Sequence, residues 1–335
     1  MVDGMTGVVL AIAALLDFWI GDPWNWLHPV QVMGWVIARY SRVALKSLNS
    51  ALLQRIAGIG LGLLLIFGSG ICGWLLVTLG FKVHPWMGGA IASILLASCL
   101  AARSLRRAAD EVIEPLEQND LAEARSRLSL YVGRDTDDLN RDAILRAVFE
   151  TVTENAVDGI MAPLFYALIG AVLGHVATGG SPSSISLSVA LALGFKASST
   201  LDSMVGYRTA PYTHLGWFSA RTDDVLTWLP CRLTVLTIGL LSKQPLHVWR
   251  ICRRDAPQDP SPNAGWSECV YAAALGVQVG GINVYRGVVK HKPKLGDADE
   301  PLAIAKVYAA LNLTRWTMLL WLTLGIILWA SLAVI

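Results

Sequence analysis

Six apolar runs dominate the sequence, and each approaches the length of about 20 residues that a helix needs to cross a bilayer. They cover roughly residues 5–21, 56–81, 86–102, 160–178, 183–200 and 316–335. The chain is 54% hydrophobic and only 16% charged, whereas about a quarter of the residues in soluble domains are charged. The sequence therefore predicts an all-α, polytopic integral membrane protein with about six membrane helices, organised as a single domain over residues 1–335.

The basic residues lie mostly in four connecting segments, 39–55, 103–146, 208–254 and 286–315. The positive-inside rule places such segments in the cytoplasm. Six crossings with both termini outside satisfy the rule, provided that the run 225–241 does not cross. Arg232 and Pro230 within that run favour a helix that lies at the interface or packs against protein.

Several other features narrow the class of protein. The five cysteines show no CxxC or CxxxC spacing and lie mostly in apolar runs, so we expect reduced packing residues rather than a disulfide framework or a zinc site. Residues 1–21 lack the basic start and cleavage site of a signal peptide and are expected to stay in the mature protein. No nucleic-acid motif is visible and basic residues alternate with acidic ones, which argues against nucleic acid as a partner.

The polar residues fall into three insertions, about 103–159, 201–224 and 250–314. In the first, Asp120 and Glu123 have the spacing of a capping box, and a helix is expected over about 141–156 after the turn-like segment GRDTDDLN. The third contains SPNAGW, GGINVYRG and KLGD, and its Pro, Gly and Asn content favours loops shaped around a ligand.

Three acids stand four residues apart where a helix is about to enter an apolar run: Glu150, Glu154 and Asp158. Positions four apart on a helix share one face, and like charges that close together repel unless cations lie among them. Magnesium suits such a cluster, because it prefers one or two carboxylates together with water and phosphate oxygens. The predicted metal ligands are Glu150, Glu154, Asp158, Asp223 and Asp224. The alternative is a solvated acidic face paired with Arg141 or Arg146.

Basic residues next to glycines or at the ends of apolar runs form a second group: Arg134, Lys196, Arg208, Arg221 and Arg286. Guanidinium and ammonium groups bind phosphate or carboxylate, so these residues are candidates for holding an anionic ligand. The alternatives are a snorkelling lysine at position 196 and membrane-surface charges at positions 208 and 286. No GxxxxGK[ST] motif is present, so nothing supports a P-loop.

Among the remaining polar and aromatic residues, Trp217 and Trp266 lie in polar, glycine-rich segments and could stack on a flat ligand. His28 and His214 are isolated and are weak candidates for metal ligands. The residues alone therefore indicate a membrane protein with an acidic, glycine-rich cytoplasmic site for a phosphorylated ligand and magnesium.

Six ordered blocks of the sequence resemble the adenosylcobinamide-phosphate synthase family, the CobD/CbiB type of cobalamin biosynthesis. The blocks are LDFWIGDPWNWLHPVQVMG (16–34), residues 132–171, FKASSTLDSMVGYR (195–208), GWFSARTDDVLTWLPCRLT (216–234), SPNAGWSECVYAAALGVQVGGINVYRG (261–287) and KLGD (294–297). Similarity in this order over nearly the whole chain is more specific than any single motif.

The resemblance implies a multi-pass enzyme of the cell inner membrane with cytoplasmic active-site loops. Such an enzyme joins adenosylcobyric acid to (R)-1-amino-2-propanol O-phosphate, or to an ethanolamine-phosphate analogue, with ATP and Mg²⁺ as cofactors. Its implied partners are the corrinoid, the aminoalcohol phosphate and membrane lipid, with a second copy of the chain or later pathway enzymes as further candidates. We interpret Asp202, Lys196, Arg134 and Arg221 as catalytic, and Arg208, Asn263, Trp266, Asn283 and Tyr285 as binding residues.

Two other classes fit part of the pattern. A membrane prenyltransferase also holds magnesium on diphosphate with acids at helix ends, but does not require the polar insertion 250–314. A transporter of corrinoid or metal should carry charged or broken helices at mid-bilayer depth, and apart from 225–241 the predicted crossings are plain. Corrinoid amidation, lipid diphosphate turnover and uptake without turnover distinguish the three.

Overall fold

The computed structural model describes residues 5–21, 28–180 and 182–332, so part of the block 16–34 lies outside the described residues. The chain divides into two compact units, and each is described by itself. Unit 1 comprises residues 1–101, 162–226 and 320–335, and unit 2 comprises residues 102–161 and 227–319. The single domain expected from the sequence stays a prediction.

Within the described residues, six helical stretches are long and apolar enough to cross a membrane, which confirms the predicted class of fold. They are Ala51–Val83, Pro85–Glu117, Arg141–Ala177, Ser183–Val205, Trp217–Leu241 and Ile304–Ser331. The set differs from the predicted runs at two places. The helix over the first run, α1 (Met5–Trp19), has only 15 residues, and the run 225–241 lies inside α10 (Trp217–Leu241), which qualifies by length and composition. The predicted orientation of the loops stays a prediction.

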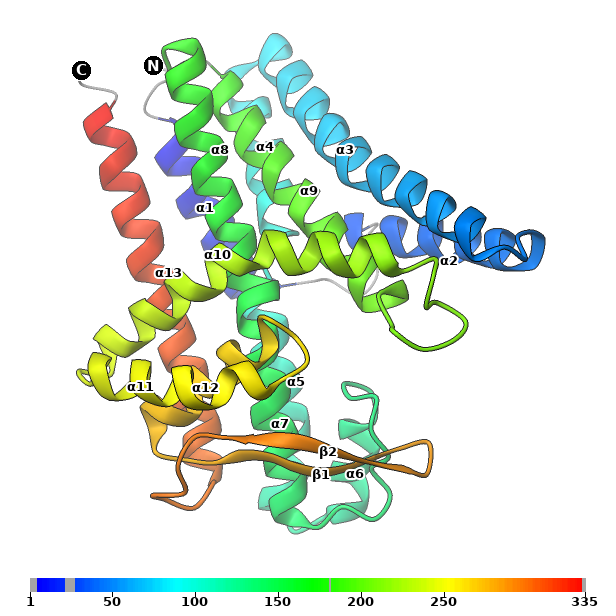
Figure 1. Cartoon of the computed structure of the whole chain (residues 1–335). Coiled ribbons are helices and arrows are strands. Elements are labelled where there is room, and N and C mark those ends of the chain that lie inside the picture. The colour runs from blue at the N-terminus through cyan, green and yellow to red at the C-terminus, as the bar shows by residue number, and fades with distance from the viewer. Residues whose placement is uncertain (1–4, 22–27, 181, 333–335) are drawn as a thin grey trace. The chain divides into compact units, whose positions relative to one another are not determined.

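Unit 1 is built from α1, α2 (Pro29–Ser47), α3 (Ala51–Val83), α4 (Pro85–Ala97), α8 (Ala162–Thr178) and α9 (Ser183–Val205), with the start of α10 and the end of α13 (Ile304–Leu332). Helices α8 and α9 lie side by side (Figure 1). Gly170 and Gly174 of α8 face the backbone of α9, where an added Cβ would approach Ser188 Cα to 2.6 Å and Ser184 Cα to 2.5 Å. Small residues at this spacing let membrane helices pack closely.

Unit 2 has a helical part formed by α5 (Ala102–Glu117), α6 (Leu121–Leu128) and α7 (Arg141–Ala156). The predicted cap is confirmed for one half of the capping box, because the Asp120 carboxylate accepts from the Glu123 N–H at 3.0 Å and α6 begins at the next residue. In place of the other half, the Asp120 N–H donates to the Pro115 carbonyl at 2.8 Å. The predicted helix over 141–156 is confirmed as well, with Asn140 as its N-cap. The apolar stripe of α7 is buried and α7 packs along α5 (Figure 1).

A single π-helical turn, Val157–Met161, follows α7 directly and leads into α8. Such turns insert an extra residue into the helical register and occur often at functional sites. The turn contains Asp158, so the third acid of the predicted stack does not follow Glu154 in regular α-helical register.

The rest of unit 2 contains α11 (Pro245–Asp255), the 3₁₀ turn Ala256–Gln258, α12 (Ala264–Leu275) and a two-stranded antiparallel sheet of β1 (Val279–Tyr285) and β2 (Val288–Leu295). The prediction that GGINVYRG forms a loop was therefore wrong. Arg286 and Gly287 form the hairpin turn with φ of 50° and 75°, as two-residue hairpin turns require. Glycine content hid the strand, although Ile282 and Val284 on one side of the turn and Val288 and Val289 on the other favour β structure.

Candidate active site

The GRD segment and the β-hairpin, about 150 residues apart in sequence, are bound to each other in unit 2. The Asp135 carboxylate accepts from the backbone N–H of Arg286 at 2.9 Å and of Gly287 at 2.7 Å. The Asp135 N–H donates to the Val284 carbonyl at 2.8 Å. One residue of the loop 133–140 therefore holds the turn of the hairpin.

We expect Asp135→Ala to loosen this attachment at a cost of about 1 kcal/mol, because the side-chain hydrogen bonds are solvent-exposed and a typical bond contributes about that much. Hydrogen–deuterium exchange should rise at residues 284–289 and stay unchanged in α5. Asp137→Ala, an exposed acid of the same loop, serves as the control. Equal exchange at the turn in both variants would show that Asp135 does not hold it.

A bulge in β1 connects the hairpin to α7. The pairing shifts register between Val279 and Gly281, and the intervening Gly280 has φ of +88°. A Cβ at Gly280 would also lie 2.0 Å from the Pro293 carbonyl oxygen, so only glycine fits. The N–H of Gly280 donates to Glu150 Oε1 at 2.9 Å, and its carbonyl accepts from Arg146 Nη1 at 2.8 Å. The backbone groups of the bulge residue are thus satisfied by two side chains of α7.

Glu150 lies at the centre of a buried polar cluster, the Glu150 network, which consists of Arg134, Arg146, Glu150, Gly280 and Asn283. Arg134 Nη2 donates to Glu150 Oε2 at 2.5 Å, and the two side chains are only 7% and 1% exposed. Asn283 Oδ1 accepts from Arg134 Nη1 at 3.0 Å and from Arg146 Nη2 at 3.4 Å. Both carboxylate oxygens of Glu150 are therefore engaged by the protein itself.

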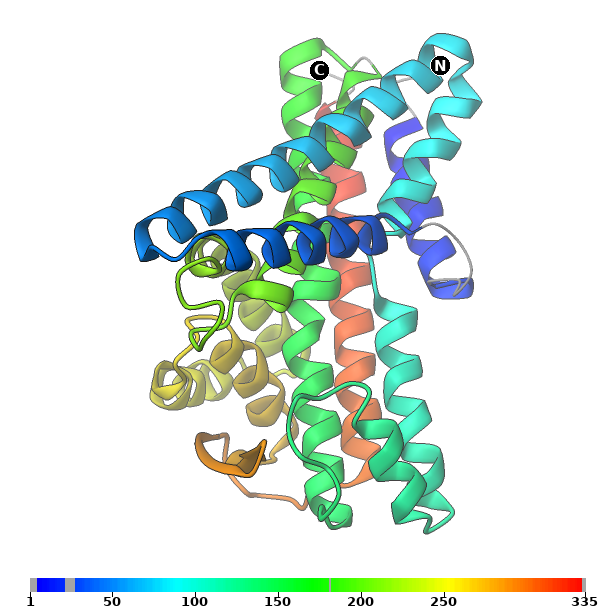
Figure 2. The same ribbon diagram turned by 90° about the vertical axis from the view of Figure 1, so that its right-hand side faces the viewer.

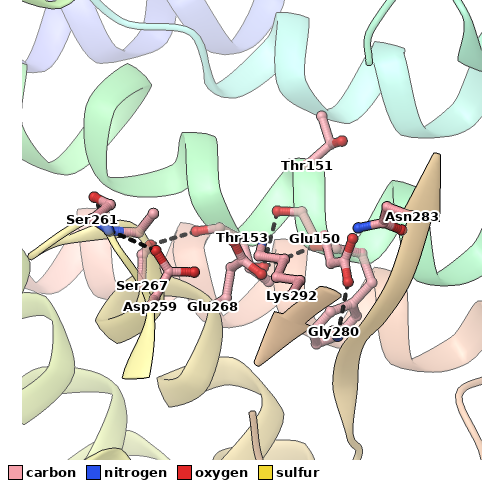
Figure 3. A network of polar contacts seen from close by, with 12 residues as sticks. Glu150, Thr151, Thr153, Asp259, Ser261, Ser267, Glu268, Gly280, Asn283 and Lys292 are labelled. Atoms are coloured by element: carbon pink, nitrogen blue, oxygen red, sulfur yellow. Dashed lines mark hydrogen bonds and ion pairs between the residues drawn. The ribbon is translucent and has the colours of Figure 1, made fainter. Parts of the chain in front are cut away.

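A second ion pair, with one buried and one partly exposed member, lies next to this network (Figure 3). Lys292 of β2 donates to Glu268 Oε1 of α12 at 2.5 Å, and the Glu268 side chain is fully buried. Its other oxygen, Oε2, has no hydrogen-bond partner among the described residues. The sequence analysis missed both residues, although one signal was present, because Glu268 is the only charged residue of α12.

Burial and neighbouring charges act on both members of this pair. Burial raises the pKa of Glu268 well above its ordinary value, and the charges of Glu154 and Glu150 raise it further while Lys292 opposes them. Burial alone would lower the pKa of Lys292, but the charges of Glu268, Glu154 and Glu150 outweigh it and raise that pKa. Lys292 is therefore bonded to Glu268 and is stabilised in its charged form by the charges of Glu154 and Glu150 as well.

Glu154 is the exposed member of this group. Its carboxyl lies within electrostatic range of Lys292, Asp259, Glu150 and Arg134. Asp259 is held in place by its own contact, since its Oδ1 accepts from the Ser261 N–H at 2.8 Å. These acids and cations bring the sequence blocks 132–171, 261–287 and the following strand into one charged region of unit 2.

The SPNAGW segment is fixed by Arg232, another residue that was not predicted as a site residue. Arg232 donates to Asn263 Oδ1 at 2.9 Å and to the Pro262 carbonyl at 2.8 Å. Its guanidinium lies 4.6 Å from the ring centre of Trp266 and 5.3 Å from that of Trp228. Arg232 is thus bonded to other residues of unit 2, and the Trp266 ring already stacks on its guanidinium.

The KLGD block forms a structural clasp with the end of α11. Asp255 accepts from the Gly296 N–H at 3.0 Å, and Arg254 bridges Asp255 and Asp297 at 2.7 Å to each. Burial opposes ionisation of Asp255, but the hydrogen bonds from Arg254 and Gly296 outweigh it and lower the pKa of this carboxyl. These contacts hold Gly296 and Asp297, directly after β2, against the end of α11.

The other predicted site residues of unit 2 lie outside these contacts. Tyr285 is half-buried beside the hairpin turn, with Lys290 Nζ 5.1 Å from its ring centre. Asp158 is half-buried on the π-helical turn. Of the predicted residues in this unit, the structure therefore brings Arg134, Glu150 and Asn283 into direct contact and Glu154 into electrostatic range.

Unit 1 holds the remaining six predicted residues. Lys196 and Asp202 lie on α9, Arg208 lies in the loop after it, and Arg221, Asp223 and Asp224 lie on the first turns of α10. Arg221 Nη1 is 3.9 Å from Asp224 Oδ2, and Asp224 is also within electrostatic range of Arg208. Asp223 is buried. The predicted functional roles of all these residues stay predictions.

A carboxylate can bind magnesium only if protein groups do not already occupy its oxygens. Among the described residues, no group of three or more His, Cys, Asp and Glu side chains could by itself hold a metal ion. Glu150 would have to break its bonds to Arg134 and Gly280 to become a ligand. Glu154 is exposed and Asp259 is half-buried near it, so these two fit a cation that takes one or two carboxylates and completes its shell with phosphate oxygens.

The comparisons with known proteins decide the family. A sequence model described as CobD/Cbib protein matches residues 10–314. The chain belongs to the CobD/CbiB family. A "Cobalamin biosynthesis protein CobD" of Synechocystis sp. is 51% identical over 319 residues, which is 95% of this chain and 90% of that protein. A "Cobalamin biosynthesis protein CbiB" of Salmonella arizonae is 40% identical, and one of Salmonella typhi is 41% identical, each over 313 residues and 92% of this chain. No solved structure matches the chain.

Proposed function

We propose that this protein is a cobalamin biosynthesis enzyme that forms the amide bond of adenosylcobinamide phosphate. Its substrates would be adenosylcobyric acid, an aminoalcohol phosphate such as (R)-1-amino-2-propanol O-phosphate, and ATP with Mg²⁺. Membership of the CobD/CbiB family supports the pathway. The observation that carries the site is the Glu150 network with its neighbour pair Glu268–Lys292, because it gathers the family-like blocks into one charged region.

The chemistry requires activation of a carboxylate. Its oxygen is a poor leaving group, so phosphoryl transfer from ATP would first convert it to an acyl phosphate. The amine nitrogen then forms the C–N bond as phosphate departs, and a carboxylate takes the proton from the ammonium. When bound, magnesium would shield the negative charge of the ATP phosphates.

The chain's own residues would divide this work. Glu154 and Asp259 would hold magnesium. Lys292 and Arg134 would compensate the negative charge of the neighbouring carboxylates. Contact of Asn263 and Asn283 with the amide-rich rim of the corrinoid, expected from the sequence, would require these buried side chains to leave their arginine partners. The unit 1 residues keep the roles expected from the sequence, with Asp202 as the proton acceptor and Lys196 and Arg221 as phosphate-binding groups.

The reaction itself is the test. Protein purified in detergent should convert adenosylcobyric acid, aminopropanol phosphate and Mg-ATP to a corrinoid whose mass has increased by that of the aminoalcohol phosphate less one water. Product should be absent when ATP is omitted. If folded protein forms no amide, binds the corrinoid and moves it across vesicles, the proposal is wrong and the transporter class is correct.

Glu154→Gln should lower the amidation rate by about 100-fold, which is of the order lost when one preorganised electrostatic group is removed from a catalytic site. The magnesium concentration for half-maximal rate should rise, because a ligand charge is lost. Glu114→Gln, an exposed acid on α5 of the same unit, should leave both quantities unchanged. Full activity in a folded Glu154→Gln protein would remove this acid from the mechanism.

We further propose that the protein resides in the cytoplasmic membrane with its basic segments in the cytoplasm. The apolar helical stretches support the multi-pass membrane location. The charge asymmetry of the loops supports the orientation, which requires that Trp217–Leu241 does not cross, although its length and composition would allow it to. Cysteine labelling from each side at positions within 103–140 and 206–216 tests it, since both segments must be labelled from the same side.

A further inference from the structure

Helix α2 in unit 1 is amphipathic. Met33, Ile37, Ser41 and Ala44 are its buried residues, and the helix packs against α9. The opposite side carries Arg39, Arg42 and Lys46, three exposed cations at positions i, i+3 and i+7, which lie along one side of a helix.

Exposed apolar side chains accompany these cations. Trp35 is 69% exposed, Val43 52% and Val32 43%. At 100° per residue the valines lie beside the cationic row and Trp35 lies within it. A helix with a basic row next to a row of exposed apolar side chains is typical of helices that lie in the membrane interface.

The direction of α2 agrees with this interpretation. Within unit 1, α2 runs crosswise to α8 and α9 (Figure 2). Because α9 is a candidate membrane span, a helix that runs across it is oriented along the plane of the bilayer, as interfacial helices are.

A cavity of about 550 Å³ opens between α2, the end of α9 and the loop that follows it. Arg42, Lys46, Ser41 and Tyr212 are polar lining residues, and Ile37 and Leu45 are among the apolar ones. No acidic side chain belongs to the lining as far as the described residues define it. The cavity therefore combines an anion-binding rim with an apolar wall.

We propose that this cavity binds an anionic phospholipid. The lipid phosphate would contact Arg42 and Lys46, and the part of an acyl chain nearest the headgroup would lie along Ile37 and Leu45. The exposed Trp35 and valines of the same helix favour a lipid over a soluble phosphate, because they need an apolar environment beside the cations. This site lies entirely in unit 1 and does not depend on the proposed reaction.

Lipid binding to the full-length protein in a neutral detergent tests the proposal, with native mass spectrometry as the readout. Dioleoylphosphatidylglycerol should bind more tightly than dioleoylphosphatidylcholine. Arg42→Gln/Lys46→Gln should weaken phosphatidylglycerol binding by about 30-fold, because each basic residue near an anionic lipid surface contributes a factor of roughly five. The affinity for phosphatidylcholine should stay unchanged.

Two control variants keep the test decisive. Arg42→Lys/Lys46→Arg preserves the charges and should retain phosphatidylglycerol binding, which separates loss of charge from misfolding. Lys82→Gln/Lys243→Asn removes two exposed cations elsewhere and should have no effect. Unchanged phosphatidylglycerol binding in the Gln variant, or an equal loss in both charge-removing variants, overturns the proposal.

A third arm separates the two sources of phosphate. Millimolar inorganic phosphate and aminopropanol phosphate should not displace phosphatidylglycerol from the wild-type protein. If either displaces the lipid at micromolar concentration, and does so only when Arg42 and Lys46 are present, the cavity is a soluble-phosphate site and the lipid assignment is wrong.

Discussion

Replacing Arg134 by methionine is expected to destabilise unit 2 by about 3–5 kcal/mol, the usual cost of removing one partner from a buried ion pair. The Glu150 carboxylate would stay buried at 1% exposure without its guanidinium partner. Asn283 would lose one of its two donors at the same time. Reversible unfolding in detergent, followed by circular dichroism, measures the loss.

The matched control is an arginine in an exposed ion pair of the same unit. Arg107 lies 2.9 Å from Glu111 and is 53% exposed, and such pairs contribute only about 0–1 kcal/mol. Arg107→Met should therefore change the free energy of unfolding little. If the two variants lose the same stability, the Glu150 network does not hold the hairpin to α7.

Lys292→Met should cost about 3 kcal/mol at neutral pH, the lower end of the range for a buried pair, because Lys292 is 20% exposed while Glu268 would stay buried close to Glu154 and Glu150. Adding Glu268→Gln to this variant should restore most of the loss, since the uncompensated buried charge is then removed. A double variant as unstable as Lys292→Met alone would show that packing, and not charge, is the cause.

The pH dependence gives a second measurement of the same pair. The pKa of Glu268 is raised above its ordinary value of 4.5 in the folded protein, so ionisation there opposes folding. The penalty is absent below pH 4.5 and grows as the pH rises to the folded pKa. The stability difference between Lys292→Met and wild type should therefore shrink as the pH falls towards 4.5, and a constant difference would contradict the assignment.

The membrane class and several local elements followed from the sequence. Apolar runs of bilayer length and low charge left few alternatives to membrane helices. The start of α6 followed from Asp120 with Glu123, and α7 followed from the turn-like segment before residue 141. These signals are local, because hydrophobic periodicity and end caps act within one or two helical turns.

The site was predicted only in part. Arg134, Glu150 and Asn283 were named from the sequence, but not their mutual contact, and Glu268, Lys292 and Arg232 were missed. Glu150 was expected to face a metal, whereas both of its oxygens accept hydrogen bonds from protein groups. The sequence around Glu150 does not indicate which hydrogen-bond donors from other segments contact its carboxylate.

The sequence by itself therefore determined the local elements of this protein, which are the membrane helices, their caps, and the polar insertions with acids, arginines and glycines. Tertiary structure alone decided the partners, above all the bulge at Gly280, which turns a backbone N–H of the hairpin towards Glu150. The physical reason is range. Helix propensity and hydrophobic patterning depend on near neighbours in the chain, but the buried Glu150 is satisfied by Arg134, 16 residues away, and by Gly280, 130 residues away.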